Sequence, residues 1–202
     1  MDALKLIAAA AAGYLLGSIS SAVLLTHTPL GGDIRDKGSG NAGATNVARV
    51  YGIWMGLLTL VLDGVKAALA MYLGTLLGGT LGATVGAAAC LIGHCWPLYF
   101  RFHGGKGVST AGAIALFLDW RFFLILIGVF LITAFLSKRA SVGSLSAAIA
   151  YPIGMFILGG FAWHQIALAF FVLVLVFFTH RTNIGRIASG TEPEFRAGRG
   201  KK

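Results

Sequence analysis

The sequence predicts an all-α, polytopic helical membrane protein with a single domain over residues 1–202. Composition is the first reason. Of its 202 residues 57% are hydrophobic and 11% charged, and the mean hydropathy is +0.83, whereas a soluble domain carries about 25% charged residues. The second reason is that apolar runs of about 17–25 residues recur, and this length crosses a bilayer as a helix. One small core could not bury so much apolar surface.

About seven transmembrane helices follow from these runs. The first, at 4–25, has few charges before it and its small residues are scattered, so we expect a retained span rather than a signal peptide. The others are expected at 51–71, 79–99, 108–118, 121–137, 142–160 and 164–180. Because 108–118 is short, the alternative is a five-span arrangement in which this helix pairs with another as a re-entrant hairpin.

The positive charges predict the orientation. Most of the 16 Lys and Arg residues fall in alternate connections, at 35–49, 101–106, 138–139 and 181–202. Cytoplasmic loops are enriched in these residues, so we expect the N-terminus outside and the C-terminus in the cytoplasm. The net charge of +9 then indicates loops facing anionic lipid rather than a nucleic-acid partner.

Polar residues gather in the same four connections. The segments "KGSGNAGATNVARV" (37–50) and "GHCWPLYFRFHGGKGVST" (93–110) are rich in glycine and lead into apolar helices, and "SKRASVGS" (137–144) and "THRTNIGRIASGTEPEF" (179–195) are similar in character. Glycine lets backbone N–H groups approach an anion, and a helix start adds free N–H groups and a positive dipole end. Lys and Arg add charge, and Ser, Thr and Asn add directional donors. These four segments therefore favour phosphate binding.

The glycines form two groups. Gly38, Gly40 and Gly43 alternate with hydrogen-bond donors, which favours anion binding over packing. Close helix packing is the expected role of Gly74, Gly78, Gly79, Gly82 and Gly86.

Ionisable residues inside the apolar runs are few. Asp63 and Lys66 lie at i and i+3 in the second predicted span and can pair on one helix face. Residues of this kind are functional by default in a membrane, but a self-neutralising pair that fixes helix packing is equally well supported. His94 and His103 flank an aromatic stretch, where an interfacial role is expected. His180 closes the last span, where both substrate contact and a structural role stay open.

Nucleotide and metal patterns are not supported. "GSGNAG" fits G-x-G-x-x-G but lacks the surrounding βαβ unit, and "GGKGVST" lacks the G-K-[ST] ending of a Walker A loop. Cys90 and Cys95 do not have the spacing of a zinc site. We therefore expect no cofactor, no metal and no nucleic acid.

At these segments the sequence resembles the bacterial acyl-phosphate:glycerol-3-phosphate acyltransferases, small inner-membrane enzymes that form lysophosphatidic acid. The resemblance covers nearly the whole chain and rests on "GSGNAGATNVAR", "GHCWPLYFRFHGGKGVST" and "HRTNIGRIASGTE", with "LDGVK" and the serine of "KRASVGS" in support. It implies acyl transfer from fatty acyl phosphate to the 1-hydroxyl of glycerol 3-phosphate, on the cytoplasmic side of the bacterial inner membrane, in phospholipid synthesis. The implied partners are both substrates and membrane lipids, and the enzyme that makes acyl phosphate is a candidate partner.

The resemblance also implies residue roles. The residues expected to be catalytic are Ser39, Arg49, Lys106, His180 and Asn183. Those expected to bind substrate phosphate are Gly38, Gly40, Asn41, Thr45, Asn46, Gly104, Gly105, Gly107 and Ser141. Glu192 matches a family glutamate for which a structural rather than a catalytic role is expected, and the roles of Asp63 and Lys66 stay open. One departure is visible, because His103 stands where the family pattern "FKGGKG" has its first lysine.

A mechanism follows from the donor, a mixed anhydride with a good leaving group. The protein must mainly align the reactants and stabilise charge. No Ser/His/Asp set is evident, and His27 and Asp33 are separated by five residues rather than the four of the soluble acyltransferase motif. We expect direct attack without an acyl-enzyme, with a substrate phosphate oxygen as the preferred base and His180 as the other candidate. The alternative function is a transporter or flippase of a phosphorylated solute or lipid, although transporters bind near the bilayer midplane.

Overall fold

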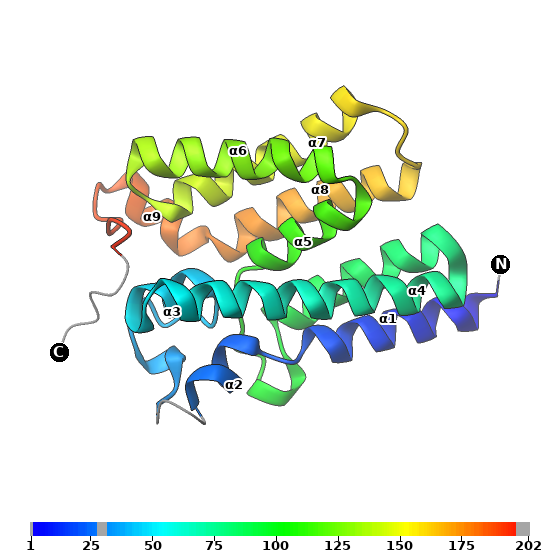
Figure 1. Ribbon diagram of the computed structural model, residues 1–202, viewed down its shortest axis with the longest axis horizontal. Coiled ribbons are helices and arrows are strands. Elements are labelled where there is room, and N and C mark those ends of the chain that lie inside the picture. The colour runs from blue at the N-terminus through cyan, green and yellow to red at the C-terminus, as the bar shows by residue number, and fades with distance from the viewer. Residues whose placement is uncertain (1, 28–31, 197–202) are drawn as a thin grey trace. The chain divides into compact units, whose positions relative to one another are not determined.

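A computed structural model describes residues 2–27 and 32–196, and within these ranges the regular elements are all helices (Figure 1). The chain divides into two compact units, one comprising the chain up to Ile114 together with Arg196 and the other Ala115–Phe195. The single domain expected over 1–202 stays a prediction, and the last cations of the predicted cytoplasmic tail, Arg199, Lys201 and Lys202, lie outside the described residues.

The first unit contains α1 (Ala3–Gly17), α2 (Ser21–His27), η1 (Ile34–Asp36), α3 (Ala44–Tyr51), α4 (Ile53–Cys95), η2 (Leu98–Phe100) and the start of α5 (Val108–Leu118). The predicted span 4–25 is broken between α1 and α2. At this break the carbonyl oxygens of Gly17 and Ile19 accept hydrogen bonds from Nζ of Lys66 at 3.2 and 2.9 Å. The break thus exposes carbonyl groups that a continuous helix would have used internally.

Helix α4 consists of two arms that fold back on each other. Gly78 and Gly79 have non-helical backbone angles, with φ of Gly79 at 59°, and the arms run side by side in Figure 1. A side chain at Gly74 would collide with the Gly82 backbone, and one at Gly86 would come within 2.6 Å of the Ala70 carbonyl oxygen. The arms correspond to the predicted segments 51–71 and 79–99. The predicted packing role is confirmed for Gly74, Gly82 and Gly86, whereas Gly78 and Gly79 form the turn between the arms and a Cβ atom at Gly79 would meet nothing within 4 Å.

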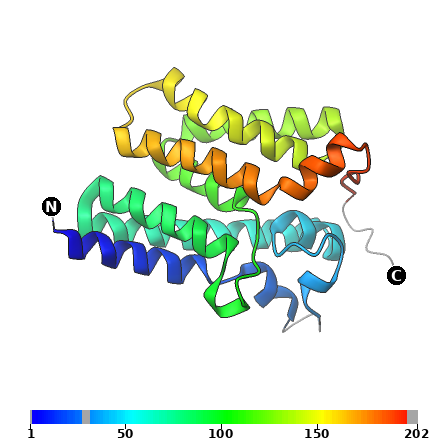
Figure 2. The ribbon, with the colours of Figure 1, turned by 180° about the vertical axis from the view of Figure 1, so that it is seen from behind.

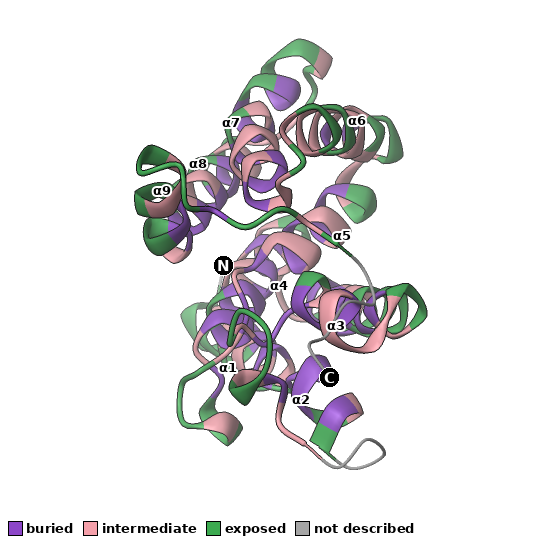
Figure 3. Ribbon diagram, turned by 90° about the vertical axis from the view of Figure 1, so that its left-hand side faces the viewer, coloured by how far each residue is buried: buried purple, intermediate pink, exposed green. Residues whose placement is uncertain are grey.

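The second arm of α4 also packs against α1, as the reverse view shows (Figure 2). A side chain at Gly13 would collide with the Gly86 backbone, and one at Gly17 with the backbone of Cys90. Buried residues accordingly gather along α1 and α4 (Figure 3). Small residues thus let the helix backbones approach closely, as in other membrane helix bundles.

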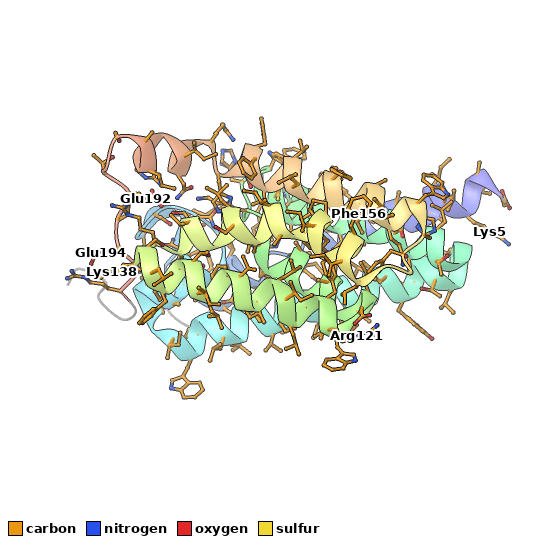
Figure 4. All side chains as sticks on the ribbon, turned by 90° about the horizontal axis from the view of Figure 1, so that it is seen from above. Lys5, Arg121, Lys138, Phe156, Glu192 and Glu194 are labelled. Atoms are coloured by element: carbon orange, nitrogen blue, oxygen red, sulfur yellow. The ribbon has the colours of Figure 1, made fainter. Side chains whose placement is uncertain are left out.

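The second unit contains α6 (Trp120–Ser137), α7 (Ala140–Leu158), α8 (Trp163–Thr179) and α9 (Arg181–Ala188). The ring of Phe122 packs edge-on against Tyr151, with centroids 4.8 Å apart. Helix α9 bends from α8 by 61°. Glu192 and Lys138 lie at one end of this unit, and Arg121 and Phe156 lie toward the other (Figure 4).

Four segments of the described chain are long and apolar enough to cross a membrane, or five if the bent pair α8–α9 is one span. They are Ala3–His27, Ile53–Phe100, Trp120–Ser137 and Ala140–Leu158, and α5 is shorter. Large apolar side chains such as Phe135, 83% exposed, form outer surfaces that suit lipid. The fold is therefore that of a multi-pass helical membrane protein, whereas the seven spans and the orientation stay predictions.

Candidate active site

The first polar segment is folded around the buried side chain of Asn46. Its Oδ1 accepts a hydrogen bond from the Ser39 backbone N–H at 2.8 Å, and its Nδ2 donates to the carbonyl oxygens of Lys37 and Asn41 at 2.9 and 3.1 Å. Asn46 therefore holds the loop in shape from inside. The prediction that it contacts phosphate directly stays a prediction.

The same loop presents donors at its surface. Gly38 and Gly40 have positive φ of 59° and 73°, a conformation that favours glycine. Ser39 and Thr45 are exposed, and α3 begins after Gly43 without a side-chain cap. A short polar turn followed by an uncapped helix start is suited to an anion.

The second polar segment forms a loop at Gly104–Gly107 that packs on the end of α4. The Gly105 N–H donates to the His94 carbonyl oxygen at 3.0 Å. A side chain at Gly104 would collide with that same oxygen, and Gly107 has a φ of 83°. Lys106, half-buried, is thus carried on a loop that only glycines can form.

The structure brings these two segments together within the first unit. A Cβ atom at Gly105 would lie 3.0 Å from the carbonyl oxygen of Ala42, which belongs to the first segment. Arg35 Nη1 also donates to the Phe100 carbonyl oxygen at 2.9 Å. Two loops rich in glycine and cations are therefore neighbours in space, although Ala42 and Gly105 lie far apart in the sequence.

In the second unit, Glu192 binds two of the other predicted residues, Ser141 and Asn183. Its Oε1 accepts hydrogen bonds from Ser141 Oγ and Asn183 Nδ2, each at 2.7 Å, and its Oε2 accepts from Arg186 Nε at 2.7 Å. We call Glu192, Ser141, Asn183 and Arg186 the Glu192 cluster. Burial alone would raise the pKa of the Glu192 carboxyl, but the hydrogen bonds from its three partners lower that pKa below its ordinary value.

His180 lies at the bend between α8 and α9 and is buried. Its Nδ1 is 2.9 Å from the Val176 carbonyl oxygen. A carbonyl oxygen can only accept, so Nδ1 carries the hydrogen and the neutral ring has its lone pair on Nε2. His180 is therefore held in the tautomer that can accept a proton at Nε2.

Comparisons with known proteins show the family of this chain. The model of the glycerol-3-phosphate acyltransferase family matches residues 7–190. The chain belongs to this family. Proteins named glycerol-3-phosphate acyltransferase from Syntrophotalea carbinolica and Mesorhizobium japonicum are 41% and 39% identical to it. These alignments cover 92% and 95% of this chain, and 95% and 97% of those proteins.

Solved structures of a family member have the same fold. PlsY (YgiH), described as an integral membrane glycerol 3-phosphate acyltransferase, is 30% identical in its glycerol 3-phosphate form, with a TM-score of 0.88 over 95% of this chain and 96% of that one. Its lysophosphatidic acid form gives a TM-score of 0.85. The present chain is accordingly an integral membrane acyltransferase.

A buried polar group around Asp63 and Lys66 was predicted only in part from the sequence. The expected pair forms, with Lys66 Nζ 3.1 Å from Asp63 Oδ1. His94, expected at the membrane interface, is instead buried beside this pair, with Nδ1 3.0 Å from Lys66 Nζ. Ser21 and Ser109 also join the pair through hydrogen bonds to Asp63. We call these five residues the Asp63 cluster. The spacing of Asp63 and Lys66 was a signal, but nothing in the sequence signalled the other three.

Proposed function

We propose that this acyltransferase moves an acyl group from a fatty acyl phosphate to the 1-hydroxyl of glycerol 3-phosphate, in phospholipid synthesis. The observation that carries the proposal is the contact between the two glycine-rich loops, with Ala42 against Gly105. Both substrates bear phosphate, so two adjoining anion-binding loops suit a reaction between them. The name of the relatives and the two ligand forms of PlsY support the acceptor.

Residue roles follow from the loops. Arg49 and Lys106 supply positive charge to the phosphates, and Ser39 donates a hydrogen bond. Backbone N–H groups near Gly38, Gly40 and Gly104–Gly107 complete the binding, with Asn41 and Thr45 as further donors. In the second unit, Ser141 and Asn183, fixed by Glu192, are proposed to act on substrate together with His180.

The reaction balances without an acyl-enzyme. The hydroxyl oxygen of glycerol 3-phosphate forms the new ester bond to the acyl carbon, and the bond from that carbon to the phosphate oxygen breaks. Inorganic phosphate leaves, and the hydroxyl proton passes to a base. Cationic and N–H donors stabilise the negative charge that develops on the carbonyl oxygen and the leaving phosphate.

A substrate phosphate oxygen is the preferred base, and His180 Nε2 is the alternative. Alanine at position 180 separates them. If turnover of His180→Ala is nearly unchanged at saturating substrate, histidine is not the base, whereas a loss of about 100-fold or more assigns the proton to it. Trapping a covalent acyl-protein from enzyme and acyl phosphate alone would contradict direct attack.

We infer that seven segments span the bacterial inner membrane and that the two glycine-rich loops lie on its cytoplasmic side. The segments are α1–α2, the two arms of α4, α5, α6, α7 and α8–α9. Single cysteines introduced at Ser39, His103 and Thr182 should react with a membrane-impermeant thiol reagent from the cytoplasmic side, and one at Arg121 from the other. Cys90 and Cys95 are buried, so they give little background. Labelling of the first three positions from opposite sides contradicts the proposal.

The decisive experiment uses purified protein in detergent micelles with acyl phosphate and glycerol 3-phosphate. We expect release of inorganic phosphate and formation of lysophosphatidic acid that require both substrates. Replacing acyl phosphate by acyl-CoA tests the donor, and equal product would contradict it. A transporter or flippase has no compartments to connect in micelles, so absence of product formation together with binding of either phosphate would favour that alternative.

A further inference from the structure

The Asp63 cluster contains two ionised side chains that the proposed chemistry does not use. Asp63 and Lys66 are only 1% and 5% exposed. Oδ1 of Asp63 accepts hydrogen bonds from Ser21 Oγ at 3.0 Å and lies 3.1 Å from Lys66 Nζ, and Oδ2 accepts from Ser109 Oγ at 2.6 Å. Charges buried this deeply need such partners, because a charge in hydrocarbon is otherwise very costly.

Lys66 orients the ring of His94. Its Nζ can only donate, so the contact of 3.0 Å leaves Nδ1 of His94 as the acceptor. Nε2 of the ring then carries the hydrogen. That end of the ring occupies the space beside Gly105, because a Cβ atom at position 105 would collide with Nε2. The backbone of His94 holds the same residue through the hydrogen bond from the Gly105 N–H.

The glycine loop is therefore fixed at both ends by one ion pair. His94, which contacts Lys66, lies against Gly104 and Gly105 at the start of the loop. Ser109 contacts Asp63 two residues after the loop ends at Gly107. We propose that the Asp63–Lys66 pair positions the Gly104–Gly107 loop for phosphate, acting through His94 and Ser109. The inference rests on the proposed function, since it assigns the loop to a substrate phosphate.

The alternative is that the Asp63–Lys66 pair only stabilises the fold and does not position the loop. It would join α2, α4 and α5, and each hydrogen bond to Asp63 would matter only for stability. The chain offers a matched comparison, because Ser21 and Ser109 each donate one hydroxyl hydrogen bond to the same carboxylate. Ser109 is next to the loop, whereas Ser21 begins α2. A positioning role therefore predicts different effects on substrate binding for Ser109 and Ser21, whereas a structural role predicts similar effects.

The test compares Ser109→Ala with Ser21→Ala in the micellar assay. We expect similar thermal midpoints, because each variant loses one hydrogen bond. For Ser109→Ala we expect KM for at least one phosphate substrate to rise about 10-fold, with kcat changed less, since a displaced loop weakens alignment of the phosphate. Ser21→Ala should keep KM within about 2-fold of the wild type, and Ser109→Thr, which retains the hydroxyl, should recover most of the loss.

Three results would overturn the inference. They are equal KM changes in the two alanine variants, an unchanged KM in Ser109→Ala, and a loss in Ser109→Ala that follows its thermal midpoint alone. These outcomes differ from failure of the proposed function, which appears as absence of two-substrate phosphate release in the wild-type protein. A wild type that is active with equivalent serine variants therefore rejects only the positioning role.

Discussion

The Asp63 cluster and the Glu192 cluster, in different units of the chain, each stabilise a buried carboxylate. In each, one buried carboxylate accepts hydrogen bonds from neutral side chains and pairs with one cation. Ser21, Ser109 and Lys66 surround Asp63. Ser141, Asn183 and Arg186 surround Glu192. Each carboxylate thus ties together segments that are distant in sequence and that carry predicted site residues.

The two clusters differ in their cations. The Lys66 side chain is 6% exposed and that of Arg186 is 41% exposed. Lys66 sits among protein acceptors in a membrane helix, so neither charge of its pair can be hydrated if the other is removed. Water can solvate Arg186, so its pairing has less influence on stability. A buried carboxylate is therefore not equally sensitive everywhere, and the burial of its partner decides the consequence of a substitution.

The largest effect is expected from Asp63→Ala. It leaves the Lys66 ammonium uncompensated, which costs about 3–5 kcal/mol when one partner of a buried pair is removed. We expect little or no folded protein, measured as the yield of monodisperse protein in detergent and its thermal midpoint.

The control for this variant removes both charges. Asp63→Leu combined with Lys66→Met should recover most of the folded yield, because an apolar replacement of a buried pair is often neutral. Its acyl transfer should stay impaired if the pair positions the glycine loop. Normal stability of Asp63→Ala would contradict the comparison, since it would mean that Lys66 finds another partner.

A smaller loss is expected from Glu192→Gln. The amide keeps one oxygen for Ser141 or Asn183, but its NH₂ group cannot accept from Arg186. Hydrogen bonds to charged groups contribute about 1.5–3 kcal/mol, so we expect a stability loss near the lower end of that range, seen as a lower thermal midpoint. Folded protein should still be obtained, and kcat/KM should fall because Asn183 loses its orientation. An effect as severe as that of Asp63→Ala would contradict the difference between the clusters.

Helices whose bounds are set by the length of an apolar run could be predicted from the sequence. The predicted segments 108–118, 121–137 and 164–180 agree closely with α5, α6 and α8, because a helix in hydrocarbon must satisfy its own backbone over the apolar run. The break between Gly17 and Ser21 was not predicted. Its free carbonyl oxygens accept hydrogen bonds from Lys66, a residue more than 40 positions away, and hydropathy contains no information on that contact.

Some local features of the candidate site could be predicted from the sequence, whereas the roles of its residues stay predictions. Glycines alternating with donors predicted the first loop, and the i,i+3 spacing predicted the Asp63–Lys66 pair. The inward role of Asn46 was missed, because its residue type alone fits a ligand donor and a loop scaffold equally well. His94 was also missed, since its partner Lys66 lies 28 residues away on the other arm of α4.

Acid should weaken the Glu192 cluster selectively. The pKa of Glu192 is lowered in the folded protein from an ordinary value of 4.5, so its ionised pairing stabilises fully above that value. This contribution is lost as pH falls below 4.5 and through the lower folded pKa. We therefore expect the difference in thermal midpoint between wild type and Glu192→Gln to shrink between about pH 5 and about pH 3. A difference that grows or stays constant over this range would contradict the assignment.

The smallest effect is expected from Arg186→Gln, below about 1 kcal/mol, because its half-exposed guanidinium is partly solvated in the wild type. Ser141 and Asn183 still donate to Glu192 in this variant, so the carboxylate keeps most of its partners. High salt should lower the wild-type thermal midpoint toward that of the variant, since the exposed charge is screened. Lys66→Gln is the matched comparison, and it should be far more damaging because Asp63 keeps its buried charge. Equal losses in the two variants would mean that burial of the cation does not determine the strength of these pairs, and the distinction between the clusters would then have to come from the carboxylates themselves.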